Sequence, residues 1–112
     1  GDKSVILAGT DEANVQHLFS TVHGAGRVMG RMQAKGKWKK GKQVRPGRVT
    51  HDDMRRATRG VVVRGGDLDE APQVYRKLET VLAAQPGIEI LETLTPLIVC
   101  MAPARTVDPF KD

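Results

Sequence analysis

The chain has 112 residues, of which 39% are hydrophobic, 28% charged and 4% aromatic. This length fits one domain with a small core, because a chain of this size buries only about 60–70% of its unfolded surface. No apolar run approaches the ~20 residues of a membrane-spanning helix, and no secretory signal opens the chain. The single cysteine, Cys100, excludes an internal disulfide and a multi-cysteine zinc site, so we expect a reducing, cytoplasmic compartment.

The N-terminal half is predicted to hold a strand, two helices and a loop. Residues 4–8 form a short apolar run that stops at Gly9, which is typical of a buried strand. A helix capped by Thr10 or Asp11 should follow, with an apolar face formed by Ala13, Val15, Leu18 and Phe19. Residues 27–34 are compatible with a second helix, and the glycines and lysines of residues 36–47 predict a loop.

The C-terminal half is predicted to alternate helices with short strands. Thr50 and the acids after it indicate the start of a helix that runs to about Arg59 and ends at Gly60. Further elements are expected as strands at 61–63, 88–91 and 97–101, a helix at 73–84, and an extended tail at 103–112. We therefore expect an α+β fold with mixed or antiparallel pairing, forming one compact unit over residues 1–112 with a basic loop at 35–48.

Positive charge is concentrated in residues 27–64. This segment holds thirteen lysines and arginines against two aspartates, so it carries +11 within a chain of +5. Such a footprint indicates a polyanionic partner, with nucleic acid first, because phosphate neutralisation dominates nucleic-acid binding. A solvated basic loop is the alternative. Trp38 lies among the lysines, where it either stacks on a base or anchors the loop to the body.

Residues 20–31 read Ser-Thr-Val-His-Gly-Ala-Gly-Arg-Val-Met-Gly-Arg, the most unusual stretch of the chain. Gly24 and Gly26 permit a close approach of the backbone to a ligand. If Arg27 opens a helix, the free N–H groups of its first turn favour an anion. Arg31 would then lie on the same helix face, and both guanidinium groups would suit phosphate oxygens.

His23 stands at the entrance of this segment and is a candidate nucleophile, because a neutral imidazole is available near pH 7. The segment therefore offers a phosphate cradle beside a nucleophile. A glycine-rich turn with an exposed histidine is the alternative, since short glycine patterns are weak signals.

The twelve residues closely resemble the signature of the RtcB family of RNA ligases, which reads Ser-x-x-His-Gly-Ala-Gly-Arg, two residues, and usually Ser-Arg. Ser4, nineteen residues before His23, resembles the family serine that contacts the guanine nucleotide. Residues 69–75 resemble the family Glu-Ala-Pro-x-x-Tyr stretch, and residues 95–101 its last core strand. Residues 108–112 resemble a tail seen in some members.

The resemblance implies an enzyme that joins an RNA 3′-phosphate or 2′,3′-cyclic phosphate to a 5′-hydroxyl in tRNA splicing and RNA repair. It implies GTP and Mn²⁺ as cofactors, tRNA halves or broken RNA as substrates, and in some organisms an activator protein. His23 would form a histidine–GMP intermediate. The implied nucleotide-binding residues are Ser4, His23, Gly24, Ala25 and Gly26, and the implied phosphate- or RNA-binding residues are Arg27 and Arg31.

The sequence departs from the family pattern at three places. Met101 and Ala102 occupy the region where many members carry a lysine that touches the nucleotide. Gly30 stands where a serine is usual, and Val62 where some members carry a tyrosine near the guanosine. These changes indicate a divergent branch and leave a non-catalytic RNA-binding module, or a domain that binds a phosphometabolite, as alternative functions.

No Mn²⁺ site is evident in the sequence. His17 falls on a predicted helix, His51 beside a helix cap, and Cys100 in an apolar strand where a core role is expected. We therefore expect the metal ligands in an upstream part of the same ligase. On this view the chain is a C-terminal fragment that carries one wall of the GTP pocket and is inactive alone, with no membrane contact.

Overall fold

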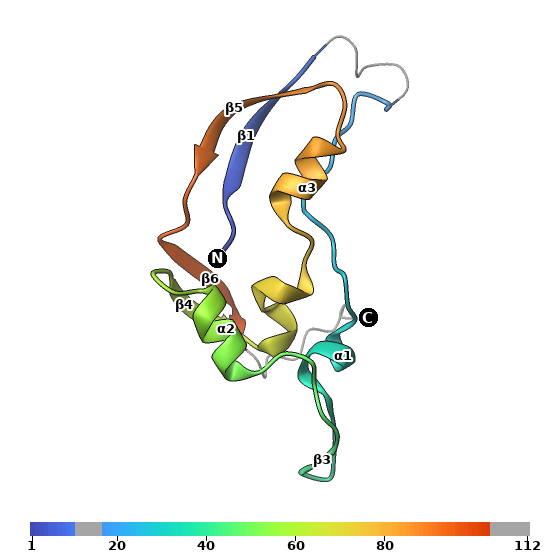
Figure 1. Ribbon diagram of the computed structural model, residues 1–112, viewed down its shortest axis with the longest axis vertical. Coiled ribbons are helices and arrows are strands. Elements are labelled where there is room, and N and C mark those ends of the chain that lie inside the picture. Colours follow the sequence, from blue (N-terminus) through green and yellow to red (C-terminus); the bar gives the residue numbers. More distant parts are fainter. Residues whose placement is uncertain (11–16, 104–112) are drawn as a thin grey trace.

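The computed structural model describes residues 1–10 and 17–103. Their strands form three separate two-stranded sheets, two antiparallel and one parallel, and short helices lie between them (Figure 1). The predicted α+β class with mixed pairing is confirmed. None of the helices in the described residues is long and apolar enough to cross a membrane.

The first sheet joins the N-terminal strand to a late one. β1 (Ser4–Gly9) pairs antiparallel with β5 (Ile88–Leu94), with a register shift between Ile6 and Leu7. The predicted strand is present but is not buried, since Val5, Leu7 and Ala8 are half-buried and the other residues of β1 are exposed. Among the described residues no third strand joins this ribbon to enclose both faces, and α3 (Leu78–Ala83) lies beside it (Figure 1).

The second and third sheets are shorter. β4 (Val62–Gly66) pairs in parallel with β6 (Ile98–Pro103). Gly65 and Gly66, at the end of β4, both have positive φ, a conformation that glycine adopts without strain. β2 (Lys37–Lys39) and β3 (Lys42–Arg45) form an antiparallel hairpin where the sequence predicted a loop. Lys40 and Gly41 make its two-residue turn with φ of 48° and 75°, the left-handed pair that fits the twist of a hairpin.

The helix predicted after Thr50 is present. α2 (His51–Ala57) begins with a reciprocal capping box, in which the Thr50 hydroxyl accepts from the Asp53 N–H and the Asp53 carboxylate accepts from the Thr50 N–H. The hydrogen bonds from Thr50 lower the pKa of Asp53, the side-chain bond more than the backbone one. The helix ends slightly earlier than predicted, and Gly60 follows with φ of 85°.

Two other predicted helices are shorter than expected. Of the helix predicted at residues 27–34, only the later part forms, as α1 (Arg31–Lys35), because Arg27 instead makes an isolated bridge with Tyr75. Within residues 73–84, a 3₁₀ turn at Pro72–Val74 is followed by extended chain before α3 begins. A second 3₁₀ turn spans Leu68–Glu70. The bridge to Tyr75 therefore overrides helix propensity on both sides of it.

The first predicted helix is wrong where it can be compared. Leu18 and Phe19 have φ of 52° and 55° and are 82% and 78% exposed, so they do not form an apolar helix face. Ala13 and Val15 lie outside the described residues, as do residues 104–112 of the predicted tail. Ala102 and Pro103 belong to β6.

The core is small and lies where α1, α2 and the two 3₁₀ turns meet. Its fully buried apolar residues are Ala34, Val49, Ala71 and Val74. Met29, Met54, Leu68 and Tyr75 pack around them. The β1–β5 and β4–β6 ribbons instead expose many apolar side chains, including Ile90, Leu91, Leu94, Leu97 and Ile98.

Gly36 closes the base of the hairpin, where backbone segments approach closely. A Cβ there would lie 2.5 Å from the Arg45 carbonyl oxygen, and φ is +83°. We expect Gly36→Ala to lower the free energy of unfolding by about 2 kcal/mol or more, from combined crowding and strain. Gly41→Ala is the matched control, since φ is +75° and nothing lies near its Cβ position. Its cost should be about 1 kcal/mol or less in urea unfolding, and equal losses would contradict this account.

Candidate functional site

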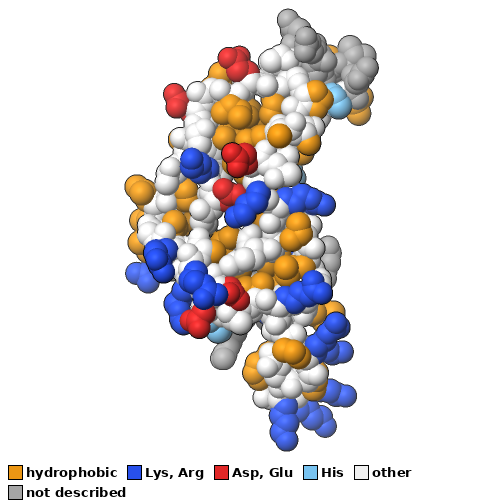
Figure 2. Space-filling view, in the orientation of Figure 1, with side chains coloured by type: hydrophobic (Ala, Val, Ile, Leu, Met, Phe, Trp, Pro, Cys, Tyr) orange, Lys and Arg blue, Asp and Glu red, His pale blue; other side chains and the backbone are white. Residues whose placement is uncertain are grey.

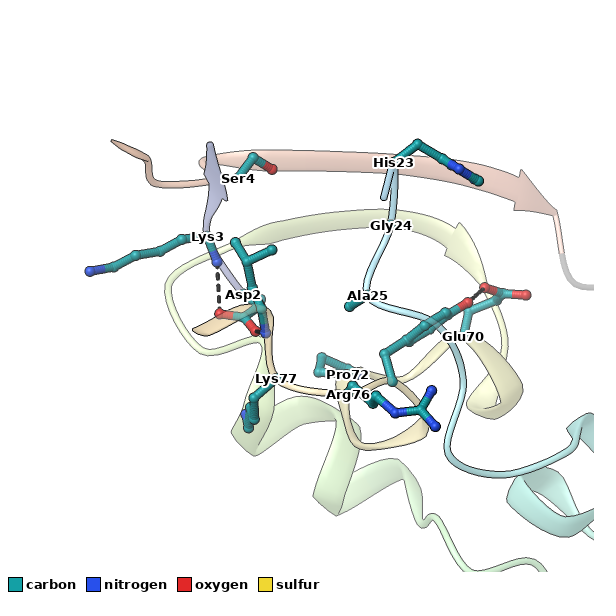
Figure 3. Close-up of a pocket in the computed structure, with 13 residues that line it drawn as sticks. Asp2, Lys3, Ser4, His23, Gly24, Ala25, Glu70, Pro72, Arg76 and Lys77 are labelled. Atoms are coloured by element: carbon teal, nitrogen blue, oxygen red, sulfur yellow. Dashed lines mark hydrogen bonds between the residues drawn. The ribbon is translucent and has the colours of Figure 1, made fainter. Parts of the chain in front are cut away.

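An open pocket of about 360 Å³ lies where three distant parts of the chain meet (Figure 3). One wall is the N-terminal segment that leads into β1, and a second is the histidine segment. The third is the stretch that runs from the end of the 3₁₀ turn at Leu68–Glu70 to the start of α3. The lining residues include Ser4, His23, Gly24, Ala25, Glu70, Pro72 and Arg76.

The pocket gathers four of the five residues predicted to bind a nucleotide. Ser4 and His23 lie on opposite sides of it, with Gly24 and Ala25 running inward from His23 (Figure 3). The His23 side chain is exposed, so its ring is accessible to a ligand. Gly26 does not line the pocket. Its carbonyl accepts from the Arg76 N–H at 2.9 Å, which fixes the end of the histidine segment.

Asp2 holds the N-terminal wall in place. Its carboxylate accepts hydrogen bonds from the Leu78 N–H at 3.1 Å and the Lys3 N–H at 2.9 Å. The Leu78 bond is the main cause of the lowered pKa of Asp2. The carboxylate thus also satisfies a free N–H at the start of α3. The consequence is that Ser4 is positioned beside the chain that carries Arg76.

Arg76 is a pocket residue that the sequence did not single out. It follows Tyr75 directly, at the end of the stretch that resembles the family motif, and that adjacency was the available signal. Its guanidinium lies on the His23 side of the pocket, whereas the ammonium of Lys3 is directed away (Figure 3). Arg76 Nη1 also donates to the Arg27 carbonyl at 3.4 Å.

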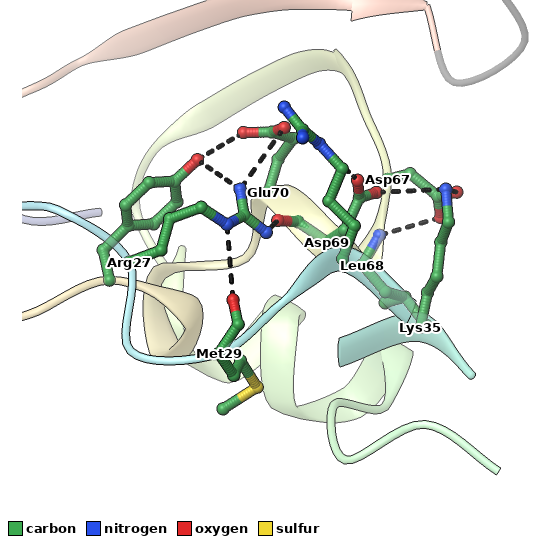
Figure 4. A network of polar contacts seen from close by, with 9 residues as sticks. Arg27, Met29, Lys35, Asp67, Leu68, Asp69 and Glu70 are labelled. Atoms are coloured by element: carbon green, nitrogen blue, oxygen red, sulfur yellow. Dashed lines mark hydrogen bonds and ion pairs between the residues drawn. The ribbon is translucent and has the colours of Figure 1, made fainter. Parts of the chain in front are cut away.

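Arg27 is directed into the body of the molecule (Figure 4). Its guanidinium donates to the Asp69 carbonyl at 2.5 Å, the Tyr75 hydroxyl at 3.1 Å and the Met29 carbonyl at 3.3 Å. It also lies 3.8 Å from a carboxylate oxygen of Glu70, and its side chain is only 25% exposed. The expectation that Arg27 opens a helix and shares one face with Arg31 is therefore wrong.

The other arginine of the motif lies against a buried carboxylate. Asp69 is 2% exposed, and its oxygens lie 3.7 Å from Arg31 Nε and 3.4 Å from Lys35 Nζ. Lys35 Nζ also lies 3.5 Å from Asp67 (Figure 4). The three N-terminal cations of the basic segment are thus neutralised within the protein, which the charge pattern alone did not reveal.

Burial and the neighbouring Glu70 carboxylate raise the pKa of Tyr75, burial being the larger cause. Its hydroxyl donates to Glu70 at 2.5 Å. Because folding raises this pKa above the ordinary 10.0, the stabilisation is full below pH 10 and is lost as pH rises through the folded-state value. We expect the free energy of unfolding of the wild type to fall with alkaline pH more steeply than that of Tyr75→Phe. Tyr75 is the chain's single tyrosine, so phenolate absorbance follows its titration directly.

The described residues do not fit a resident Mn²⁺ ion, because among them no three His, Cys, Asp or Glu side chains gather as a ligand set. His17 is exposed in a turn rather than on a helix, and His51 is exposed at the first position of α2. Cys100 is exposed on β6, so the expected core role is wrong. Within residues 1–10 and 17–103, no third strand joins the β4–β6 pair.

Comparison with known proteins identifies the family. The family model described as tRNA-splicing ligase RtcB matches residues 1–102, which include the pocket, the Arg27 network and the hairpin. The chain belongs to the RtcB family. The resemblance carried by the histidine segment is thereby confirmed.

Curated members of the RtcB family match over most of this chain. It is 33% identical over 102 residues to the RNA-splicing ligase RtcB of Escherichia coli strain K12, covering 90% of this chain and 22% of that protein. It is 35% identical over 86 residues to the tRNA-splicing ligase RtcB of Pyrococcus furiosus, covering 73% and 8%. The Archaeoglobus fulgidus tRNA-splicing ligase RtcB is 37% identical over 86 residues, with coverage of 73% and 16%. The chain thus spans less than a quarter of the length of these relatives, and no solved structure matches.

Proposed function

We propose that this chain is the part of a GTP-dependent RtcB-type RNA ligase that carries the nucleotide-accepting histidine, His23. The observation that carries the proposal is the pocket itself. Its lining combines the exposed His23, Ser4 on the opposite side, two small residues of the histidine segment and Arg76. This is the arrangement that a nucleotidyl transfer to histidine needs: an accessible nucleophile, backbone that admits a phosphate closely, and a cation.

The proposed first step is attack by a neutral ring nitrogen of His23 on the α-phosphorus of GTP. A phosphorus–nitrogen bond forms, the bond from that phosphorus to the bridging oxygen breaks, and pyrophosphate leaves. The proton on the other ring nitrogen passes to solvent or stays on the ring. Arg76 would stabilise the negative charge on the phosphate oxygens, and Gly24 would let the backbone approach them.

In the remaining steps, the GMP group moves from His23 to an RNA 3′-phosphate, and an RNA 5′-hydroxyl then displaces GMP to form the new phosphodiester. A 2′,3′-cyclic phosphate would first be opened by water. The substrate class is a pair of RNA ends, such as tRNA halves or broken RNA. An activator protein is part of the same proposal.

The chain would do this as the C-terminal portion of a longer ligase. Its ribbons expose apolar residues that a folded partner would cover, with Leu97 74% and Ile98 64% exposed. The remainder of the ligase is the proposed partner, and it would supply the Mn²⁺ ligands that the described residues of this chain lack. Manganese, when bound there, would polarise the phosphate that His23 attacks.

Covalent labelling tests this function. The longer ligase that contains this chain is incubated with GTP and Mn²⁺, and its intact mass is measured after an alkaline quench. The expected result is a gain of one GMP, labile in acid, and no gain for the 112-residue chain alone. Failure of the folded, metal-loaded ligase to gain GMP would contradict the proposal.

A non-catalytic RNA-binding module is the second candidate. It is favoured by Met101 and Ala102, which stand where many family members carry a lysine at the nucleotide. The Met101 side chain lies against Gly66, and Met101 is not among the residues that line the pocket. RNA binding without any adduct would support this candidate over the ligase.

A further inference from the structure

The hairpin β2–β3 projects from the end of the molecule opposite the β1–β5 ribbon (Figure 1). Five of its nine residues are cationic, and none is acidic: Lys37, Lys39, Lys40, Lys42 and Arg45. The space-filling view shows blue side chains along the right edge and the bottom of this projection (Figure 2). The hairpin is thus an arm with a dense positive surface.

None of the five hairpin cations makes an ion pair within the described residues, a property that Arg48, Arg59 and Arg64 of the basic segment share. Across residues 1–10 and 17–103, ion pairs are made by Arg27, Arg31, Lys35, Arg55 and Arg56, and by no cation of the hairpin. Five of the eight other cations of the basic segment are thus paired within the described residues, whereas the hairpin gathers five unpaired cations in nine residues. An external anion is the remaining source of neutralisation.

The arm also carries charge at a cost to its own stability. Lys39 lies opposite Lys42 and Lys37 opposite Arg45, so like charges face each other across the two strands. Such pairs destabilise a sheet. The turn places Lys40 at φ of 48°, where glycine, asparagine or aspartate is favoured. Both features oppose folding of the hairpin, and an anion between the paired cations would relieve their repulsion.

Trp38 adds a flat surface between the cations. It is 61% exposed and lies opposite Gln43 in the hairpin. It lines an open groove of about 640 Å³ at the base of the arm, shared with Pro46 and His51. An exposed tryptophan flanked by lysines is a combination that binds single strands, because every base has a face that stacks on it. An acidic peptide or a lipid headgroup supplies charge without such a face.

We propose that the hairpin is a docking arm for single-stranded RNA, separate from the His23 pocket. Lys39, Lys40 and Lys42 contact successive backbone phosphates, and Trp38 stacks on one base. This inference rests on the proposed function for the choice of RNA as the polyanion. It adds a surface, and with it a way to hold an RNA end before the joining reaction.

Fluorescence of the 112-residue chain tests the arm without GTP or metal. Trp38 is the only tryptophan, so its emission reports this site alone. An oligouridylate of about 12 nucleotides, a length that one small domain covers, should quench it on binding. Three phosphate contacts to a single strand predict a slope of about −2 for the logarithm of the binding constant against the logarithm of salt concentration.

Two triple variants with the same change in net charge separate the arm from general electrostatics. Lys39→Gln, Lys40→Gln and Lys42→Gln together should weaken oligouridylate binding about tenfold or more at low salt and flatten the salt slope. Arg55→Gln, Arg59→Gln and Arg64→Gln remove three exposed cations elsewhere and should change binding about twofold or less. Urea unfolding checks that both variants remain folded.

The stacking role of Trp38 is tested separately. Trp38→Ala should weaken oligouridylate binding about tenfold, measured by the fluorescence anisotropy of labelled RNA, whereas Trp38→Phe should retain most of the binding.

Several results would overturn the proposal. Equal losses in the two triple variants would show that charge acts diffusely. Inorganic polyphosphate that quenches Trp38 as strongly as RNA would show a plain anion site, and binding to phosphatidylserine vesicles without binding to RNA would show a membrane surface. The GMP-labelling experiment does not depend on the arm. Loss of the adduct with arm-dependent RNA binding intact would therefore contradict only the proposed ligase chemistry.

Discussion

Replacement of His23 by alanine or asparagine is expected to abolish GMP labelling of the longer ligase completely. Asparagine keeps a polar side chain of similar reach but has no nucleophilic ring nitrogen, so no phosphorus–nitrogen bond can form. His23 is exposed and makes no hydrogen bond among those found in the described residues. Its loss should therefore leave the free energy of unfolding within about 0.5 kcal/mol of the wild type.

The chain supplies its own controls for this prediction. It contains three histidines, and His17 and His51 are exposed away from the pocket. His17→Ala and His51→Ala should each retain labelling at the wild-type level, measured by intact mass under identical GTP and Mn²⁺ concentrations. Labelling that survives His23→Asn but disappears in either control would assign the nucleophile to another histidine.

The sequence predicts an element correctly where a few neighbouring residues determine its conformation. Thr50 and Asp53 satisfy each other within one turn, so the start of α2 could be predicted from the sequence. The hairpin could not, because its turn uses Lys40 in a left-handed conformation that sequence rules assign to glycine or asparagine. Its glycines therefore indicated only a loop.

Long-range pairing explains the helices that were predicted wrongly. Residues 27–34 have helix-compatible composition, but Arg27 is held by a bridge and a side-chain hydrogen bond to Tyr75, 48 positions away. Such a contact is invisible to a local pattern. The same contact removes Arg27 from the predicted anion-binding helix and brings Arg76, which the pattern missed, to the pocket.

The candidate site also combines residues that a local motif predicts with contacts that only folding creates. Ser4, His23, Gly24 and Ala25 were predicted together from a motif, and they line one pocket. Composition could not show which cations of the basic segment are available, because Asp67, Asp69 and Glu70 are distant in sequence. Folding brings these acids to the first three basic residues of the segment and leaves the hairpin unpaired.

Arg27→Ala is expected to lower the free energy of unfolding by about 2–4 kcal/mol. The substitution removes donors from two backbone carbonyls and the Tyr75 hydroxyl, and leaves Glu70 without its nearest cation. The guanidinium carbon also lies 5.1 Å from the centre of the Tyr75 ring, a further contact that alanine loses. Arg27→Lys should recover only a small part, because one ammonium cannot reach three separately directed acceptors.

Arg55→Ala is the matched control in urea unfolding. Arg55 pairs with Asp52 one turn away on α2, but its side chain is 74% exposed, so the loss should be about 0.5 kcal/mol or less. If Arg27→Ala costs no more than Arg55→Ala, the network does not hold the guanidinium, and Arg27 is free to meet phosphate as the motif suggested. If the large loss is observed, Arg27 supports the fold beside the pocket, and Arg76 becomes the cation that faces the proposed nucleotide.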